Sequence, residues 1–205
     1  MTEREARDWL LGRFGAPCEA RLAIFVDLLI AESNQQNLIS KASIAEIWTR
    51  HIVDSAQLLA VVDTPADGLW VDIGTGAGLP GIVIAILRDG PIQMVEPRRK
   101  RVEFLDHCID VLGLGCANVS LSKAEAIDPR RAAVISARAV AALPALFVSA
   151  HHLAGKDTIW LLPKGQSAQS EVDAARKSWQ GSFHVEQSIT HPDSKIVVAR
   201  GVRPR

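Results

Sequence analysis

The amino-terminal third of the chain has apolar residues at the spacing of an amphipathic helix. Between residues 17 and 34 they recur every three or four positions, at Leu22, Phe25, Val26, Leu29 and Ile30. A second stripe with the same spacing runs from residue 44 to residue 62. This period is that of an α-helix with one buried face. Residues 1 to about 62 are therefore predicted to be helical, and the turn-forming segment 64–68 is predicted to end this unit.

Short apolar runs alternate with helical patterns in the rest of the chain. Strands are predicted at 69–73, 91–96, 118–122, 132–136, 157–162, 183–189 and 195–199, and helices at 82–88, 99–114, 143–153 and 169–179. This alternation predicts an α/β fold, with a doubly wound, mainly parallel sheet covered by helices on both faces. The segment 190–194 is too short for a helical crossover, so the last two strands are expected to form an antiparallel hairpin. The expected domains are a helical extension, 1–64, and a Rossmann-like domain, 65–205.

Composition and charge narrow the class of protein. Apolar residues make up 48% of the chain and charged residues 22%, which is typical of a globular core and not of a disordered chain. Lys plus Arg and Asp plus Glu each total 23, so any contact with nucleic acid must use local basic patches. The three cysteines share no CxxC spacing, so neither a disulfide framework nor a metal site is expected.

The most apolar segment, 132–155, is long enough to cross a membrane. It contains Arg138 and Pro144, however, and a buried strand followed by a helix explains it better. The start of the chain mixes charges and has no apolar stretch typical of a secretory signal. We therefore expect a cytoplasmic protein without a membrane partner, and a monomer.

A glycine-rich turn follows the first predicted strand. Gly76, Gly78 and Gly81 match the pattern GxGxxG, which is weak support for nucleotide binding when it stands alone. Glycines let the backbone turn sharply and let a ligand approach the main chain. In a doubly wound sheet, ligands bind beyond the carboxyl ends of the strands, where the winding reverses. Gly74 and Gly76 are therefore candidate cofactor-binding residues.

Two carboxylates indicate which ligand the turn could hold. Asp72 comes two residues before Gly74 and would repel a pyrophosphate, so it favours a ligand with positive charge and no phosphate, such as S-adenosylmethionine. Glu96 ends the second strand, where an acid can accept hydrogen bonds from both ribose hydroxyls. The alternative is that both acids only cap helices and that the glycines only form a tight turn.

Several segments together resemble the bacterial small-subunit rRNA guanine-N7 methyltransferase G family, also called GidB. They are NLIS at 37–40, RHIVDS at 50–55, DIGTGAGLPG at 72–81, KR at 100–101 with FL at 104–105, RAVA at 138–141 and KG at 164–165. The glycine segment is common to many class I methyltransferases. Its LPG ending combined with the RHxxDS helix is much more specific to this family.

The resemblance implies the class I methyltransferase fold and methylation at N7 of one guanine in 16S rRNA, position 527 in rRNA numbering. It implies S-adenosylmethionine as cofactor, and 16S rRNA or the small ribosomal subunit as partner. The implied contacts are Gly74 and Leu79 for the methionine part, Glu96 for the ribose, Ala124 and Glu125 for the adenine, and Arg138 at the end of the fourth strand. N7 has an available lone pair and no proton, so the transfer needs no general base and depends on positioning.

Two cations are candidates for the catalytic site. Arg138 interrupts an apolar run, and its burial would be costly without anionic or carbonyl partners. It could bind the cofactor carboxylate or an RNA phosphate, or it could form a structural ion pair, for instance with Glu125 or Asp72. Lys164 follows the fifth strand beside Gly165 and is placed to reach the same cleft.

A second group of cations is a candidate for binding RNA. Arg98, Arg99 and Arg101 begin a predicted helix, where positive charge is unfavourable unless an anion compensates it. They could contact RNA phosphates, with Lys123, Arg130 and Arg131 extending the patch, or they could form a solvated helix end. Arg50 and His51 could face RNA, but His51 could equally be a packed histidine with Asp54 as its partner.

Two other functions stay open at this point. One is a nicotinamide-dependent oxidoreductase with the same fold, which the charge of Asp72 opposes. The other is a non-catalytic module that binds RNA or senses the cofactor.

Overall fold

The computed structural model describes residues 1–61, 63 and 67–205. The predicted domain boundary between residues 64 and 65 lies outside the described residues, as does residue 62 at the end of the second apolar stripe. The division into a helical extension and a second domain therefore stays a prediction.

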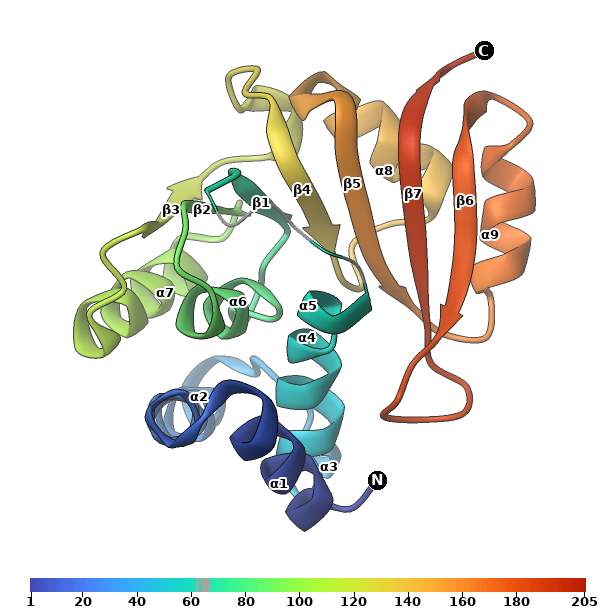
Figure 1. Cartoon of the computed structure of the whole chain (residues 1–205). Helices are drawn as coiled ribbons and strands as arrows, with labels where there is room; N and C mark the ends of the chain where they lie inside the picture. The colour runs from blue at the N-terminus through green and yellow to red at the C-terminus, as the bar shows by residue number, and fades with distance from the viewer. Residues whose placement is uncertain (62, 64–66) are drawn as a thin grey trace.

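Seven strands form one mixed sheet in the order β3-β2-β1-β4-β5-β7-β6 (Figure 1). They are β1 (Trp70–Ile73), β2 (Ile92–Glu96), β3 (Ala117–Leu121), β4 (Ala132–Ala137), β5 (Ala154–Lys164), β6 (Trp179–Gln187) and β7 (Lys195–Pro204). The first five are parallel, while β7 pairs antiparallel with both β5 and β6. The predicted α/β fold and the antiparallel hairpin at its carboxyl-terminal end are confirmed.

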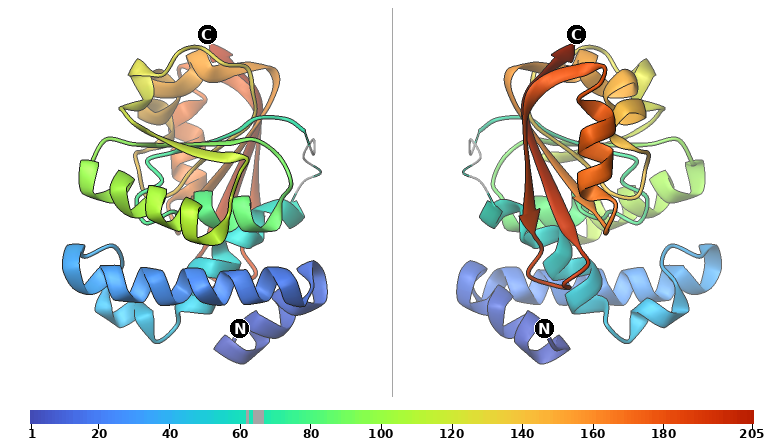
Figure 2. Two further views of the ribbon diagram at one scale, coloured as in Figure 1. Left: turned by 90° about the vertical axis from the view of Figure 1, so that its left-hand side faces the viewer. Right: turned by 90° about the vertical axis from the view of Figure 1, so that its right-hand side faces the viewer.

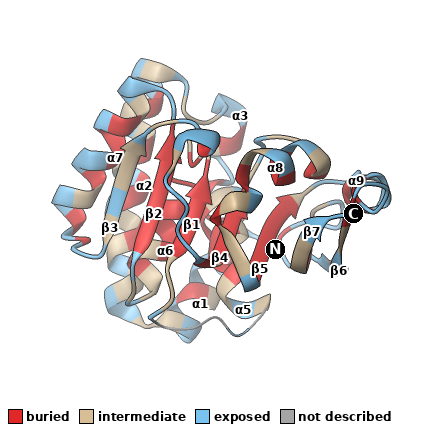
Figure 3. Cartoon of the chain, turned by 90° about the horizontal axis from the view of Figure 1, so that it is seen from above, coloured by how far each residue is buried: buried red, intermediate tan, exposed pale blue. Residues whose placement is uncertain are grey.

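Helices cover both faces of the sheet (Figures 1 and 3). One face packs against α6 (Gly81–Leu87) and α7 (Arg99–Leu112), and the other against α8 (Leu143–Ala150) and α9 (Ala168–Ala175). Successive residues of a strand point to opposite faces. Trp70 accordingly packs with Ile84 of α6, whereas Val71 belongs to the cluster around Phe147 of α8.

Helix α2 (Ala16–Gln36) forms a further layer outside α6 and α7 (Figure 2). It begins after Gly15, which has a φ of 82° and also ends α1 (Glu3–Phe14). The predicted apolar stripe faces inward, and Leu22, Phe25 and Leu29 are fully buried. This part of the helical prediction is confirmed.

The second predicted helix is divided into short pieces. These are α3 (Lys41–Ile44), a π-helical segment η1 (Trp48–Val53), α4 (Asp54–Ala56) and α5 (Leu58–Val61). At the break, the amide groups of Trp48 and Thr49 donate to the carboxylate of Glu3, each at 2.9 Å. A side chain from α1 thus replaces the backbone acceptors that a continuous helix would supply.

The ends of two elements also differ from the sequence prediction. Helix α9 ends at Ala175, and Trp179, predicted as its last residue, instead begins β6. The Trp179 ring is buried and lies 5.5 Å from the ring of Phe147 between centroids, which anchors the start of that strand. Helix α8 is followed by a 3₁₀ turn, η3 (His151–Leu153), so the predicted helix there is in two parts. Among the described residues, no helix combines the length and apolar character that crossing a bilayer requires.

Candidate functional site

The carboxyl ends of β1, β2, β4 and β5 meet at one edge of the sheet, and the winding reverses between β1 and β4. This is where an open α/β sheet binds its ligand. The glycine turn 74–80, the loop 138–142 and the segment 163–165 all leave the sheet at this edge. The candidate site is therefore built from loops that a rigid sheet holds in register.

Asp72 lies beneath the glycine turn and is fully buried. One carboxylate oxygen accepts a hydrogen bond from the Ser136 hydroxyl at 2.6 Å, and the other accepts from the amide of Gly81 at 2.9 Å. Ser136 in turn accepts from the indole N–H of Trp70 at 2.8 Å. Burial raises the pKa of Asp72 to about 6, although its hydrogen bonds act in the opposite direction.

This placement differs from the expected direct contact between Asp72 and a ligand. Residues 70 and 72 point to the same face of β1, and that face packs against α6. Asp72 therefore holds the amide of Gly81 at the start of α6, which is the helix-capping role that the sequence left as the alternative. Its negative charge still lies directly under the turn.

Glu96 connects the glycine turn with the start of α7. Its carboxylate accepts from the amide of Gly76 at 3.0 Å and from the amide of Arg98 at 2.9 Å. The guanidinium of Arg101 lies 3.8 Å from the same carboxylate. Glu96 is thus the anion that compensates the cationic start of α7.

The residues of the expected RNA patch differ in their surroundings. Arg101 lies beside the glycine turn, partly buried and 3.8 Å from Glu96, and its role in binding RNA stays a prediction. Arg98, Arg99 and Lys123 are exposed near the carboxyl ends of β2 and β3. Arg131 precedes β4 and packs beside Gly155 at the opposite edge of the sheet, so the predicted extension of the patch to this residue is wrong.

Two glycines of the turn have conformations and neighbours that exclude a side chain. Gly74 and Gly78 have φ values of 61° and 81°. A Cβ at Gly74 would lie 2.7 Å from a methyl group of Val140, and one at Gly78 would lie 2.6 Å from Ile82. Val140 thus joins the loop after β4 to the glycine turn, a contact that no local sequence pattern indicates.

The remaining residues implied for the cofactor lie in the turn itself and in the loop after β3. The loop after β3 contains a 3₁₀ turn, η2 (Ala124–Ala126), and is joined to β2 by the amide of Ser122, which donates to the Glu96 carbonyl at 3.2 Å. Ala124 is buried and Glu125 is exposed. The side chain of Leu79 is buried in the core, so only its backbone can face a ligand at the turn.

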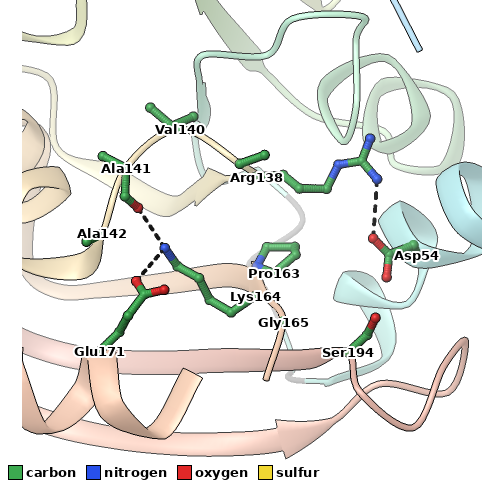
Figure 4. Close-up of a pocket in the computed structure, with 11 residues that line it drawn as sticks. Asp54, Arg138, Val140, Ala141, Ala142, Pro163, Lys164, Gly165, Glu171 and Ser194 are labelled. Carbon is green, nitrogen blue, oxygen red and sulfur yellow. Dashed lines mark hydrogen bonds and ion pairs between the residues drawn. The ribbon is translucent and has the colours of Figure 1, made fainter. Parts of the chain in front are cut away.

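Arg138 joins the end of β4 to the amino-terminal helices (Figure 4). Its guanidinium donates to the carboxylate of Asp54 and to the carbonyl of Arg50, both at 3.3 Å. The proposed partners Glu125 and Asp72 are therefore wrong, and Asp54, 84 positions earlier in the chain, is the ion-pair partner. Asp54 also accepts from the Thr190 hydroxyl at 3.2 Å, which ties in the connection between β6 and β7.

His51 is a packed, hydrogen-bonded residue and does not face RNA freely. Its Nδ1 lies 3.3 Å from the Arg138 guanidinium and its Nε2 lies 2.9 Å from the Ser43 hydroxyl. Because arginine can only donate, Nδ1 accepts, and the ring proton lies on Nε2. Burial, followed by the positive charges of Arg138 and Arg50, lowers the pKa of His51 to about 3. The expected partner Asp54 is replaced by Arg138, while Arg50 itself is exposed and pairs with Glu46 at 3.5 Å.

A cleft of about 450 Å³ opens between the loop after β4 and the end of β5 (Figure 4). The ammonium of Lys164 lies at its wall, 2.8 Å from the carboxylate of Glu171 and 2.7 Å from the carbonyl of Ala141. Burial raises the pKa of Glu171, but hydrogen bonds from Lys164 and Ser167 outweigh it and leave that pKa below its usual value. Glu171 was missed by the sequence reasoning, because a glutamate in the first turn of a helix is too common to indicate a site.

A larger hollow of about 760 Å³ shares Asp54, Arg138, Gly165 and Ser194 with the cleft. It extends to Arg50 on the amino-terminal helices and to His191 in the connection between β6 and β7. The cleft is therefore open toward a surface built by both ends of the chain. Over the described residues, no three His, Cys, Asp or Glu side chains are grouped as a metal site would require.

The sequence of this chain is similar to that of a known family and of several of its members. A sequence model of the GidB family, described as rRNA small subunit methyltransferase G, matches residues 18–198. The ribosomal RNA small subunit methyltransferase G of Novosphingobium aromaticivorans is 45% identical over 204 residues, covering 98% of this chain and 89% of that protein. The protein of the same name from Rhizorhabdus wittichii is 44% identical and is 95% covered, with all of this chain aligned.

Among solved structures, a mutant of MtNAS in complex with S-adenosylmethionine is similar in fold, with a TM-score of 0.64 at 17% identity. The alignment covers 90% of this chain and 76% of that one. At this identity the likeness concerns the fold alone.

Proposed function

The chain belongs to the rRNA small subunit methyltransferase G family, and we propose that it methylates N7 of the guanine at position 527 of 16S rRNA. Membership of the family makes it an S-adenosylmethionine-dependent rRNA methyltransferase. The observation that supports the proposal most directly is the cleft at the carboxyl-terminal edge of the sheet, which reaches the glycine turn through Val140.

The residues at the turn fit S-adenosylmethionine. Each oxygen of the Glu96 carboxylate accepts one backbone N–H, which leaves a lone pair on each for a ribose hydroxyl. Gly76 has no side chain to cover the turn, and Ala124 is a small residue in the loop after the neighbouring strand β3. When bound, this cofactor supplies a methyl group activated by its sulfonium charge.

Asp72 supports this choice of cofactor indirectly. With a pKa of about 6 it is mostly ionised at neutral pH. A negative charge beneath the turn favours a sulfonium ligand and disfavours the pyrophosphate of a nicotinamide cofactor. We propose that Asp72 contributes through this field and through its bond to Gly81, without touching the ligand.

The reaction needs positioning more than proton transfer. N7 of guanine has a free lone pair and no proton, so no side chain has to act as a general base. Arg138 donates to three groups within the described chain, which leaves two of its five N–H groups for an anion in the cleft. We propose that this anion is the cofactor carboxylate, with exposed Arg50, Arg98, Arg99 and Lys123 contacting RNA phosphates.

The direct test uses the purified chain, labelled S-adenosylmethionine, and small ribosomal subunits from cells that lack the corresponding gene. We expect label at N7 of the guanine at position 527, and no competition by nicotinamide dinucleotide. Binding without transfer would favour the non-catalytic module, and nicotinamide binding would favour the oxidoreductase. The protein is proposed to act as a monomer in the cytoplasm, and light scattering after gel filtration tests its oligomeric state.

A further inference from the structure

The cleft has a hydrogen-bond donor, Lys164, and an acceptor, Glu171, next to each other in its wall, and the proposed function assigns no role to this pair. A cationic donor and an anionic acceptor lie 2.8 Å apart in its wall, and their side chains are only 10% and 19% exposed. Charged groups that are this deeply buried disfavour the binding of any molecule that leaves their hydrogen bonds unsatisfied. This cleft can therefore select between bases of similar size.

Lys164 and Glu171 do not use all of their hydrogen-bonding positions within the described chain. Lys164 has three N–H groups and uses two of them, for Ala141 and Glu171. Glu171 has about four lone-pair positions and uses three, for Lys164, the Leu143 amide and the Ser167 hydroxyl. Within the described chain, one donor thus remains on Lys164 and one acceptor on Oε1 of Glu171, the carboxylate oxygen that is not bonded to Lys164.

The edges of the purine bases differ in the order of these groups. Guanine presents the O6 acceptor next to the N1–H donor, whereas adenine presents an amino donor next to the N1 acceptor. A donor beside an acceptor on the protein therefore matches guanine and opposes adenine. Contacts to O6 and N1 also leave N7, on the other side of O6, free to receive a methyl group.

Resting on the proposed function, we propose that Lys164 and Glu171 select the target guanine, Lys164 donating to O6 and Glu171 accepting from N1–H. The place of the cleft agrees with this assignment. Its wall residue Val140 packs on Gly74, so a base held by the pair lies next to the glycine turn where the methyl donor is proposed to bind. Glu171 is then a specificity-determining residue that lies outside the motifs of the sequence.

The test compares synthetic rRNA substrates that carry guanine, hypoxanthine or 2-aminopurine at the target position. Hypoxanthine keeps O6 and N1–H, whereas 2-aminopurine keeps N7 but lacks both. We expect the wild-type chain to methylate hypoxanthine within a few-fold of guanine, and 2-aminopurine roughly ten- to a hundred-fold less efficiently in kcat/KM. Equal efficiency on 2-aminopurine and guanine would overturn the assignment.

Glu171→Gln then separates recognition from a purely structural ion pair. We expect it to reduce kcat/KM on guanine while leaving the rate on 2-aminopurine nearly unchanged, with S-adenosylmethionine affinity intact by calorimetry. An equal loss on both bases would show that the pair only supports the fold.

Asp173→Asn, which changes an exposed acid on the same helix, is the matched control and should change neither rate. If Glu171→Gln fails to fold, Lys164→Gln is compared on the same substrates. Absence of transfer by the wild-type chain to any substrate would instead contradict the proposed function.

Discussion

The carboxylates of Asp72 and Glu96 both bind backbone amides of the glycine turn or of the helices that follow it. They differ in what surrounds them. Asp72 is enclosed by Ser136 and α6, whereas Glu96 lies where the turn, the loop after β3 and the Arg101 guanidinium meet. Both side chains are buried, but Glu96 adjoins the glycine turn and the loop after β3, so we propose that it, and not Asp72, contacts the cofactor directly.

Glu96→Gln tests this difference. A glutamine has one acceptor oxygen where the carboxylate has two, so the variant cannot hold both backbone amides and both ribose hydroxyls. We expect the Kd for S-adenosylmethionine to rise by roughly ten- to a hundred-fold, the range of a lost hydrogen bond to a charged group, as measured by calorimetry. Glu103→Gln, an exposed acid on α7, should leave the Kd unchanged. A Kd within two-fold of the wild type in Glu96→Gln would remove this residue from the cofactor site.

Packing restricts the conformation of the glycine turn. Gly78 has a φ of 81° and lies against Ile82 and Leu105, whereas Gly113, after α7, has a φ of 58° with no atom near its Cβ position. Both positions require a left-handed backbone. Only Gly78 also requires the absence of a side chain.

Gly78→Ala and Gly113→Ala separate these two costs. Each alanine pays for the left-handed conformation, which costs about 1–2 kcal/mol. Gly78→Ala also forces a Cβ to within 2.6 Å of Ile82, and overpacking of this kind adds about 1–3 kcal/mol. Urea unfolding should therefore show a larger loss of free energy of unfolding in Gly78→Ala. Equal losses in the two variants would mean that the turn relaxes without strain.

Most of the elements were predictable because their apolar periods are local. The parallel strands, the helices between them and the closing hairpin all follow from patterns within a few residues. Trp179 was assigned to the wrong element because a buried aromatic residue occurs both on the inner face of a helix and at the start of a strand. The break before η1 was unpredictable because it depends on Glu3, whose contact with Trp48 comes from a different helix.

The candidate site joins segments that lie far apart in the sequence and that no local pattern connects. Asp54 links Arg138 at the end of β4 with Thr190 before β7, so both ends of the chain build the wall of the cleft. The sequence did indicate the glycine turn, Glu96 and Arg138. It did not indicate the pairing of Lys164 with Glu171, because that contact depends on how α9 packs beside β5.

The pH dependence of stability brings two buried groups into opposition. The pKa of Asp72 is about 6 in the folded chain against an ordinary value of 3.8. Between about pH 4 and 6 the folded chain therefore binds a proton here that the unfolded chain does not bind. The contribution of Asp72 to stability decreases as the pH rises through this range. The pKa of His51 is about 3 against 6.5, so its contribution increases with pH and is lost as pH falls below 6.5. The two effects partly cancel in the wild-type chain.

Asp72→Asn should remove the first effect and leave the second. We expect the stability of this variant to fall more steeply than that of the wild type on acidification from pH 6 to pH 4, by a difference on the order of 2 kcal/mol over this range. Urea midpoints measured at half-unit pH intervals would show it. Asp157→Asn, which changes an exposed acid, should follow the wild-type curve.

His51→Gln should have the opposite effect on the slope, because only the contribution of Asp72 then remains. Parallel curves for Asp72→Asn and the wild type would mean that Asp72 is ionised in the folded chain throughout this range.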